Sequence, residues 1–333
     1  MILNNLKMGL AFDDVLLIPQ YSEIPSRSTV DLSVDLGKGI VLKNPIVSAN
    51  MKHVTEIKMA KTIANLGGLA LLHRFFDNPL EDIPKMFLEI NNSSNVGCSI
   101  GIQDHDQELI RKLVDVGCKI ICLDVAHAHT KRTGEMVSFI AKNFPEVLLI
   151  AGTVATKEGA VFLNNHGADV IRCGIGSGSI CTTRIETGNG YPLLSSLDEC
   201  VSPRYKLMAD GGMRTAGDLT KALCFADCVM LGSLLSATEE APGDIITHEG
   251  ISKKRYDGSS TFKPNRVEGV SCLVPLKGSV VPIIQKLLEG IASGCSYQGA
   301  TNLKELKNNP QFVRITNAGL VESHPHNVYK TNS

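Results

Sequence analysis

The chain has 333 residues, 43% of them hydrophobic, and its formal net charge at pH 7 is −1. This length suits one large α/β barrel or two ordinary domains. The balanced charge gives no broad basic surface, so we expect no nucleic-acid partner. No apolar run in the sequence reaches the roughly 20 residues that span a bilayer, and the first residues lack the pattern of a signal peptide. We therefore expect a cytoplasmic protein without a membrane partner.

Ten cysteines are spread along the chain. Several lie inside apolar runs, as Cys98, Cys122 and Cys173 do, and none belongs to a C-x-x-C pair or to a zinc-ligand spacing. This distribution indicates reduced thiols that are mostly buried, as in cytoplasmic proteins.

A regular alternation begins after an irregular N-terminal segment, residues 1–45, which we expect to cover one end of a core. Continuous apolar runs of strand length follow, and such runs are typical of strands buried on both faces. Eight of them begin near Ile46, Leu69, Val96, Lys119, Val147, Asp169, Lys206 and Cys228.

Helical patterns lie between several of these runs, with apolar residues at helical spacing and threonines at two expected N-caps, Thr55 and Thr156. They cover residues 55–66, 107–116, 135–144, 156–165 and 215–225. The alternation predicts an α/β fold, a (β/α)8 TIM barrel that forms a single domain over residues 1–333. A doubly wound sheet is the alternative, but eight units and the lack of a dinucleotide fingerprint argue against it.

The longest step between two predicted strands contains the sequence GIGSGSICTTR, residues 174–184. Its glycines let the backbone approach a ligand closely. Cys181 is a soft nucleophile, and the positive charge of Arg184 would favour its thiolate. Because barrel active sites lie in the loops after the strands, we expect the site here. A flexible glycine turn with a buried cysteine is the alternative.

Other predicted strands also end in polar residues or glycines. Glycines after the seventh and eighth strands stand where barrels commonly bind phosphate. His127 and His129 lack a third metal ligand in the sequence, so we expect them to have a loop role. Residues 238–278 are polar and rich in glycine, serine and proline, which indicates an excursion over the barrel mouth, and a helix is predicted over 280–292.

The segments GIGSGSICTTR, MADGGMRTAGD, VMLGS and NAGLVESHPHNV together resemble the IMP dehydrogenase/GMP reductase family, over nearly the whole chain. The resemblance implies a (β/α)8 barrel in homotetramers that acts on a purine nucleotide. It implies that Cys181 attacks C2 of the purine, that Thr183 and Glu268 relay protons, and that Asp210 binds the ribose. A solvated loop charge is the alternative for Glu268. The other implied nucleotide contacts are Ser48, Asn50, Ser179, Gly211, Gly212, Gly232, Ser233, Tyr256, Gly258 and Ser259.

The resemblance also implies a dinucleotide side and a cation site. The residues implied on the dinucleotide side are Arg74, Asp124, Val125 and Ala126. A potassium ion would be held by Gly176, Gly178 and Cys181, with Glu322, Ser323 and His324 arriving from a neighbouring subunit. A frayed terminus is the alternative for this tail.

Two features favour the reductase within this family. The chain has no inserted regulatory module between its second and third strands, and only SSTFKPNRV separates Gly258 from Glu268, where dehydrogenases carry a long mobile flap. The predicted activity is therefore the NADPH-dependent conversion of GMP into IMP and ammonia. The tail ESHPHN is more typical of dehydrogenases. An IMP dehydrogenase without the module, converting IMP into XMP with NAD, is one alternative, and a catalytically silent nucleotide-binding protein is another.

Overall fold

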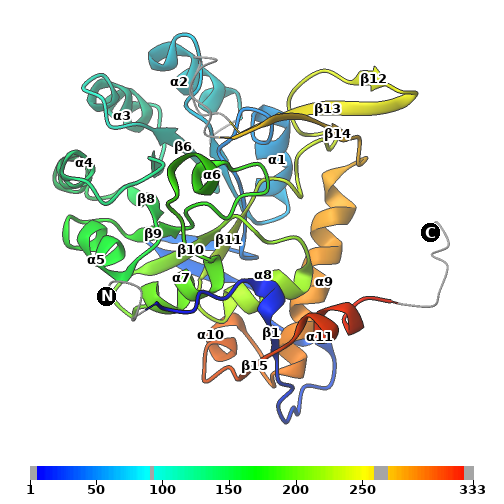
Figure 1. Ribbon diagram of the computed structural model, residues 1–333. Coiled ribbons are helices and arrows are strands. Elements are labelled where there is room, and N and C mark those ends of the chain that lie inside the picture. Colours follow the sequence, from blue (N-terminus) through cyan, green and yellow to red (C-terminus); the bar gives the residue numbers. More distant parts are fainter. Residues whose placement is uncertain (1–5, 91–93, 259–268, 326–333) are drawn as a thin grey trace.

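The computed structural model describes residues 6–90, 94–258 and 269–325 of the chain. Its centre is a closed barrel of eight parallel strands, in the order β10-β11-β4-β5-β6-β7-β8-β9 (Figure 1). The strands are β4 (Ile46–Ser48), β5 (Leu69–Leu72), β6 (Val96–Ile100), β7 (Ile120–Asp124), β8 (Leu148–Val154), β9 (Val170–Cys173), β10 (Lys206–Asp210) and β11 (Cys228–Leu231). The predicted (β/α)8 barrel is confirmed.

Burial explains why these strands could be located in the sequence. Every residue of β5, β6, β8 and β11 is buried. One side of each strand faces the barrel interior and the other faces the helices, so both must be apolar.

Helices surround the barrel (Figure 1). They are α1 (Ile57–Asn65), α2 (Pro79–Glu89), α3 (Asp106–Asp115), α4 (Lys131–Asn143), α5 (Lys157–Asn165), α7 (Leu193–Cys200), α8 (Ala216–Leu223) and α9 (Val280–Tyr297). None of the described helices has the length and apolar content required to traverse a bilayer.

The predicted helix boundaries hold in part. Thr156 caps α5 by accepting a hydrogen bond from the backbone N–H of Gly159. Thr55 does not cap α1, because its hydroxyl donates to the carbonyl of Ala49 at 2.7 Å and Glu56 takes the cap position. Helix α4 begins at Lys131, earlier than predicted, because its first turn is largely polar and Thr130 caps it.

The N-terminal segment is more regular than we predicted. Strand β1 (Val15–Leu17) pairs with β15 (Phe312–Arg314), and β2 (Val34–Gly37) forms a hairpin with β3 (Ile40–Leu42). Strands this short hold too few residues to show a period in the sequence. The remaining short helices are η2 (Phe12–Asp14), η3 (Arg27–Thr29), α6 (Thr183–Thr187), α10 (Leu303–Leu306) and α11 (Asn317–Glu322).

The excursion after β11 is an antiparallel sheet that projects from the barrel, drawn in yellow and orange in Figure 1. Its strands are β12 (Ile246–His248), β13 (Ile251–Asp257) and β14 (Ser271–Pro275). The ammonium group of the buried Lys254 in β13 donates to the carbonyls of Thr238 and Ala241 at 2.9 and 2.6 Å. These bonds attach the sheet to the segment that follows β11.

Candidate active site

A cavity of about 530 Å³ opens at the carboxyl ends of the barrel strands. Its lining includes residues that directly follow six different barrel strands. All eight parallel strands end at the same rim, so side chains that are distant in sequence meet there. The residues in question are Ala49 after β4, Gly101 after β6, Val125 after β7, Gly174 after β9, Gly211 after β10 and Gly232 after β11.

The glycine-rich loop after β9 lies directly against the end of β10. The φ angle of Gly174 is +150°, and a Cβ atom there would collide with the carbonyl oxygen of Asp210. The hydroxyl of Ser177 donates a 3.0 Å hydrogen bond to the same carbonyl. These two contacts hold the loop against the end of β10 where it leaves β9.

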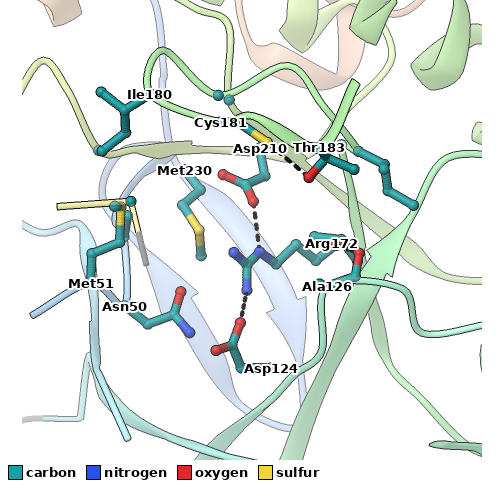
Figure 2. A pocket seen from close by; sticks show the side chains of 18 of the residues that line it. Asn50, Met51, Asp124, Ala126, Arg172, Ile180, Cys181, Thr183, Asp210 and Met230 are labelled. Carbon is teal, nitrogen blue, oxygen red and sulfur yellow. Dashed lines mark hydrogen bonds and ion pairs between the residues drawn. The ribbon is translucent and has the colours of Figure 1, made fainter. Parts of the chain in front are cut away.

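Cys181 is partly exposed in this loop and lines the cavity. Its thiol donates a hydrogen bond of 3.2 Å to the hydroxyl of Thr183, the first residue of α6 (Figure 2). Cys181, for which the resemblance implies the nucleophile, and Thr183, for which it implies a proton relay with Glu268, are therefore in contact.

Arg184 does not have the role that we predicted for it. Its guanidinium donates to the carbonyl of Tyr191 at 3.0 Å, and its aliphatic carbons pack against Gly176 and Gly190. The side chain therefore stabilises the shape of the loop and is not directed at the Cys181 thiol.

The two ends of the segment between β13 and β14 meet beside Cys181. Gly269 forms an isolated antiparallel bridge with Cys181, and the backbone N–H of Gly258 donates to the carbonyl of Val270 at 3.1 Å. The N–H of Val270 in turn donates to the carbonyl of Ile180 at 3.0 Å. The predicted site residues Ser259 and Glu268 lie outside the described residues, and Glu268 directly precedes Gly269 in the sequence.

A network of carboxylates and guanidinium groups crosses the floor of the cavity (Figure 2). Arg172 in β9 binds Asp124 at the end of β7 through Nη1 at 2.7 Å and Asp210 at the end of β10 through Nε at 2.8 Å. The Nε atom of Arg74 lies 3.4 Å from the other Asp124 oxygen, and its guanidinium carbon lies 4.7 Å from the centroid of the Phe75 ring.

The charges in this network change the protonation of its members. Burial raises the pKa of the Asp124 carboxyl, but Arg172 and Arg74 outweigh this effect, and the pKa lies below its usual value. Burial lowers the pKa of the Arg172 guanidinium, but the neighbouring charges of Asp210 and Asp124 raise it by more than burial lowers it. The net pKa is raised, so the group stays charged. The floor of the cavity therefore holds an ionised Asp124 beside a permanent cation.

Tyr256 closes another part of the cavity wall. Its ring is buried, burial raises the pKa of its hydroxyl, and a Cβ atom on Gly232 would stand 2.9 Å from the hydroxyl oxygen. Glycine at position 232 leaves the backbone open to the cavity at this point.

Most predicted site residues come together in this cavity, and a few do not. Ser48 is fully buried, does not line the cavity, and its hydroxyl has no hydrogen-bond partner among the described residues. Glu322, the last residue of α11, and Ser323 and His324, which follow the helix, do not line it either. The predicted residues that line it are Asn50, Arg74, Asp124, Val125, Ala126, Gly176, Gly178, Ser179, Cys181, Thr183, Asp210, Gly211, Gly212, Gly232, Ser233, Tyr256 and Gly258.

Sequence reasoning missed several lining residues. Arg172 lies inside an otherwise apolar strand, so only its charge within that run could have singled it out. Lys52 is a second cation near the strand ends besides Arg74. The others include Met51, Phe75, Gln103, Thr153, Met230 and Asp257. Within the described ranges, no group of three or more His, Cys, Asp or Glu side chains could hold a metal ion.

Comparison with known proteins gives consistent matches along the chain. Residues 9–326 match the family model described as IMP dehydrogenase / GMP reductase domain. An inosine-5'-monophosphate dehydrogenase of Aquifex aeolicus is 32% identical over 475 residues, covering 98% of this chain and 97% of that protein. One of Borreliella burgdorferi is 32% identical over 396 residues, covering 97% and 98%. A GMP reductase of Leishmania major is 30% identical over 485 residues, covering 98% and 99%.

Proposed function

Because the chain belongs to the IMP dehydrogenase/GMP reductase family, we propose that it is a GMP reductase, which converts GMP and NADPH into IMP, ammonia and NADP⁺. The names of its relatives denote oxidoreductases of purine nucleotides. The cavity that contains Cys181 at the carboxyl end of the barrel is where such a nucleotide would bind.

One observation carries the choice of the reductase. The segment between Gly258 and Gly269 holds ten residues, and both of its ends lie beside Cys181. Such a segment can extend outward and return over no more than about 18 Å. In the dehydrogenase, water must reach the covalent purine, and a long flap brings the group that activates it. In the reductase ammonia leaves and the cofactor stays, so this chain length is sufficient.

The lining of the cavity fits both ligands. Glycines at 211, 212 and 232 expose backbone to the nucleotide, and Tyr256 stands beside the last of them. On the other side of the cavity, Arg74 stacks on Phe75 and lies next to Asp124. The Arg74 guanidinium can bind a phosphate, and the carboxylate oxygens of Asp124 can accept hydrogen bonds from hydroxyl groups.

The chemistry proceeds through a covalent bond to the protein. The Cys181 thiolate adds to C2 of GMP, and Thr183 with Glu268 delivers a proton to the 2-amino group, which leaves as ammonia when the C–N bond breaks. When bound on the side of Arg74 and Asp124, a reduced nicotinamide cofactor would provide the hydride that C2 receives. Cleavage of the C2–Sγ bond then frees IMP and restores the thiolate. The addition divides one difficult displacement into two easier steps.

We also expect a cytoplasmic homotetramer that binds potassium through Gly176, Gly178 and Cys181. The tail from Glu322 to His324 does not line the cavity of its own chain, and in the proposed tetramer it would contact the loop of a neighbouring subunit. This arrangement is carried over from the family resemblance.

The decisive experiment incubates the purified protein with GMP plus NADPH and, separately, with IMP plus NAD⁺. We expect NADPH consumption with IMP and ammonia as products, and little XMP from IMP. The Cys181→Ala variant serves as the control for contaminating activity. Strong XMP production without any NADPH consumption in the presence of GMP would overturn the proposal. Binding of both nucleotides without any turnover would instead indicate a silent nucleotide-binding protein.

Dehydrogenation of IMP is the second candidate, because most of the relatives compared carry that name. The lack of an inserted module does not separate the two reactions. The alignments with a dehydrogenase and with the reductase extend over 475 and 485 residues, although this chain has only 333. Relatives with either activity therefore carry additional segments.

A further inference from the structure

Arg172 contacts two carboxylates that line the cavity, Asp124 and Asp210. It lies inside the barrel on β9, and its side chain is only 11% exposed. Its two carboxylate partners lie at the ends of two other strands, Asp124 on β7 and Asp210 on β10. Strand β10 is a direct neighbour of β9, whereas β7 is separated from β9 by β8, so the guanidinium joins a neighbouring strand to a more distant one (Figure 2).

We propose that Arg172 is a positioning residue that couples the two ligand sites by holding Asp210 and Asp124 in one rigid unit. The assignment of Asp210 to the nucleotide and of Asp124 to the dinucleotide rests on the proposed function. The coupling itself follows from the contacts of Arg172.

The geometry of the guanidinium makes this unit rigid. The guanidinium group is planar, and its N–H bonds point in fixed directions. The hydrogen bonds from Nε to Asp210 at 2.8 Å and from Nη1 to Asp124 at 2.7 Å therefore orient both carboxylates at once. Displacement of one carboxylate turns the plane and moves the other. Nη2 makes no hydrogen bond within the part of the chain that the structure describes, which leaves its two N–H groups for a ligand.

The charges give a second reason for coupling. Two carboxylates share one central cation, and Arg74 adds a second positive charge only at Asp124, at 3.4 Å. A ligand hydroxyl that binds one carboxylate changes how strongly Arg172 is held by the other. Such coupling is reciprocal. The bound nucleotide should therefore change the affinity for the dinucleotide by the same factor by which the bound dinucleotide changes the affinity for the nucleotide.

Three variants and a matched control separate coupling from simple structural support. Arg172→Lys keeps the charge but loses the planar fork, whereas Asp210→Asn and Asp124→Asn each weaken one arm. The control is Arg214→Lys, because Arg214 also bridges two aspartates, Asp13 at 2.5 Å and Asp218 at 3.4 Å, but does not line the cavity.

The measurement is isothermal titration of IMP and of NADP⁺, each alone and in the presence of the other, with the melting temperature of every variant recorded. We expect Arg172→Lys to weaken both ligands by about tenfold and to bring the coupling factor close to one. Asp210→Asn should weaken mainly IMP, and Asp124→Asn mainly NADP⁺. Arg214→Lys should bind both within about twofold of the unaltered protein, because Arg214 does not line the cavity and its side chain is 57% exposed.

Loss of affinity for only one ligand in Arg172→Lys, or an unchanged coupling factor, would overturn the proposal. If that variant does not fold, the double variant Asp124→Asn/Asp210→Asn decides. The factor by which the double variant loses affinity for each ligand should differ by about threefold or more from the product of the factors measured for the two single variants. A factor equal to that product would refute coupling. If the protein instead oxidises IMP, the titrations are repeated with XMP and NAD⁺, which do not react with each other, and Arg172→Lys should again lose the coupling. The test of coupling is therefore separate from the test of the reductase assignment.

Discussion

Gly174 and Asp210 touch through their backbones, so that a side chain on Gly174 would collide with the carbonyl oxygen of Asp210. The hydroxyl of Ser177 donates to the same oxygen at 3.0 Å. The end of β10 therefore determines the path of the loop that carries Cys181.

Gly174→Ala should displace this loop and remove most activity. The added methyl group meets backbone, which cannot rotate away, so we expect a loss of roughly 3 kcal/mol in unfolding free energy. Gly117→Ala is the matched control, because Gly117 also has a positive φ, +86°, but nothing lies within 4 Å of an added Cβ. It should cost only about 1 kcal/mol from backbone strain. Urea unfolding and turnover of both variants test this, and equal effects would contradict the steric argument.

Cys181→Ala should abolish turnover and leave nucleotide binding within about threefold of the unaltered protein, because most contacts to a nucleotide come from other residues. Calorimetry with IMP and steady-state assays provide the two readings. Cys272→Ala is a suitable control, because Cys272 is also only partly buried but does not line the cavity. Turnover that survives the loss of Cys181 would rule out covalent catalysis.

Arg74→Ala should weaken NADPH by about tenfold and NADH by much less, because a guanidinium binds phosphate through two charge-assisted hydrogen bonds. Affinities for both cofactors can be compared by fluorescence titration. Arg132→Ala is the control, since Arg132 pairs with the exposed Asp104 and does not line the cavity. Equal losses for NADPH and NADH would mean that Arg74 does not contact the 2′-phosphate.

Potassium should stimulate activity, and cutting the chain before Glu322 should remove the stimulation. The physical reason is that a cation held by loop carbonyls would stabilise the loop around Cys181. Rates in potassium, sodium and choline salts at equal ionic strength test this for both chains. Identical rates in all three salts, for the intact and the shortened chain, would leave the tail without this role.

Asp124 should make stability depend on pH under acidic conditions. Its pKa is lowered in the folded protein, so the ionised carboxylate stabilises the fold above the unfolded value of about 3.9, and this contribution is lost as the pH falls below it. Asp124→Asn should cost about 2 kcal/mol at pH 7 and should flatten the decline in melting temperature below about pH 4. Asp104→Asn removes a fully exposed carboxylate and should change little. A decline as steep in Asp124→Asn as in the unaltered protein would refute the prediction.

The strands of the barrel and the loop after β9 could be predicted from the sequence because their signals are local. Leu69–Leu72 and most of its counterparts are apolar along a continuous run, since a strand inside a covered barrel is buried on both faces. The reactive loop concentrates glycines, hydroxyls and a thiol in eleven consecutive residues, 174–184. Thr156 could be identified as a helix cap for the same reason, because the group it binds is three residues away.

Interactions between distant residues were decided only by the tertiary structure. β1 and β15 pair across almost the whole chain, and neither is long enough to show a period. Arg184 follows Cys181 closely in sequence but turns to Tyr191. Arg172 reads as an interruption of an apolar strand, and its partners Asp124 and Asp210 lie 48 and 38 positions away. A sequence shows which residues carry charge, but closure of the barrel determines which charges share its interior, because that depends on the strand order and register around the ring.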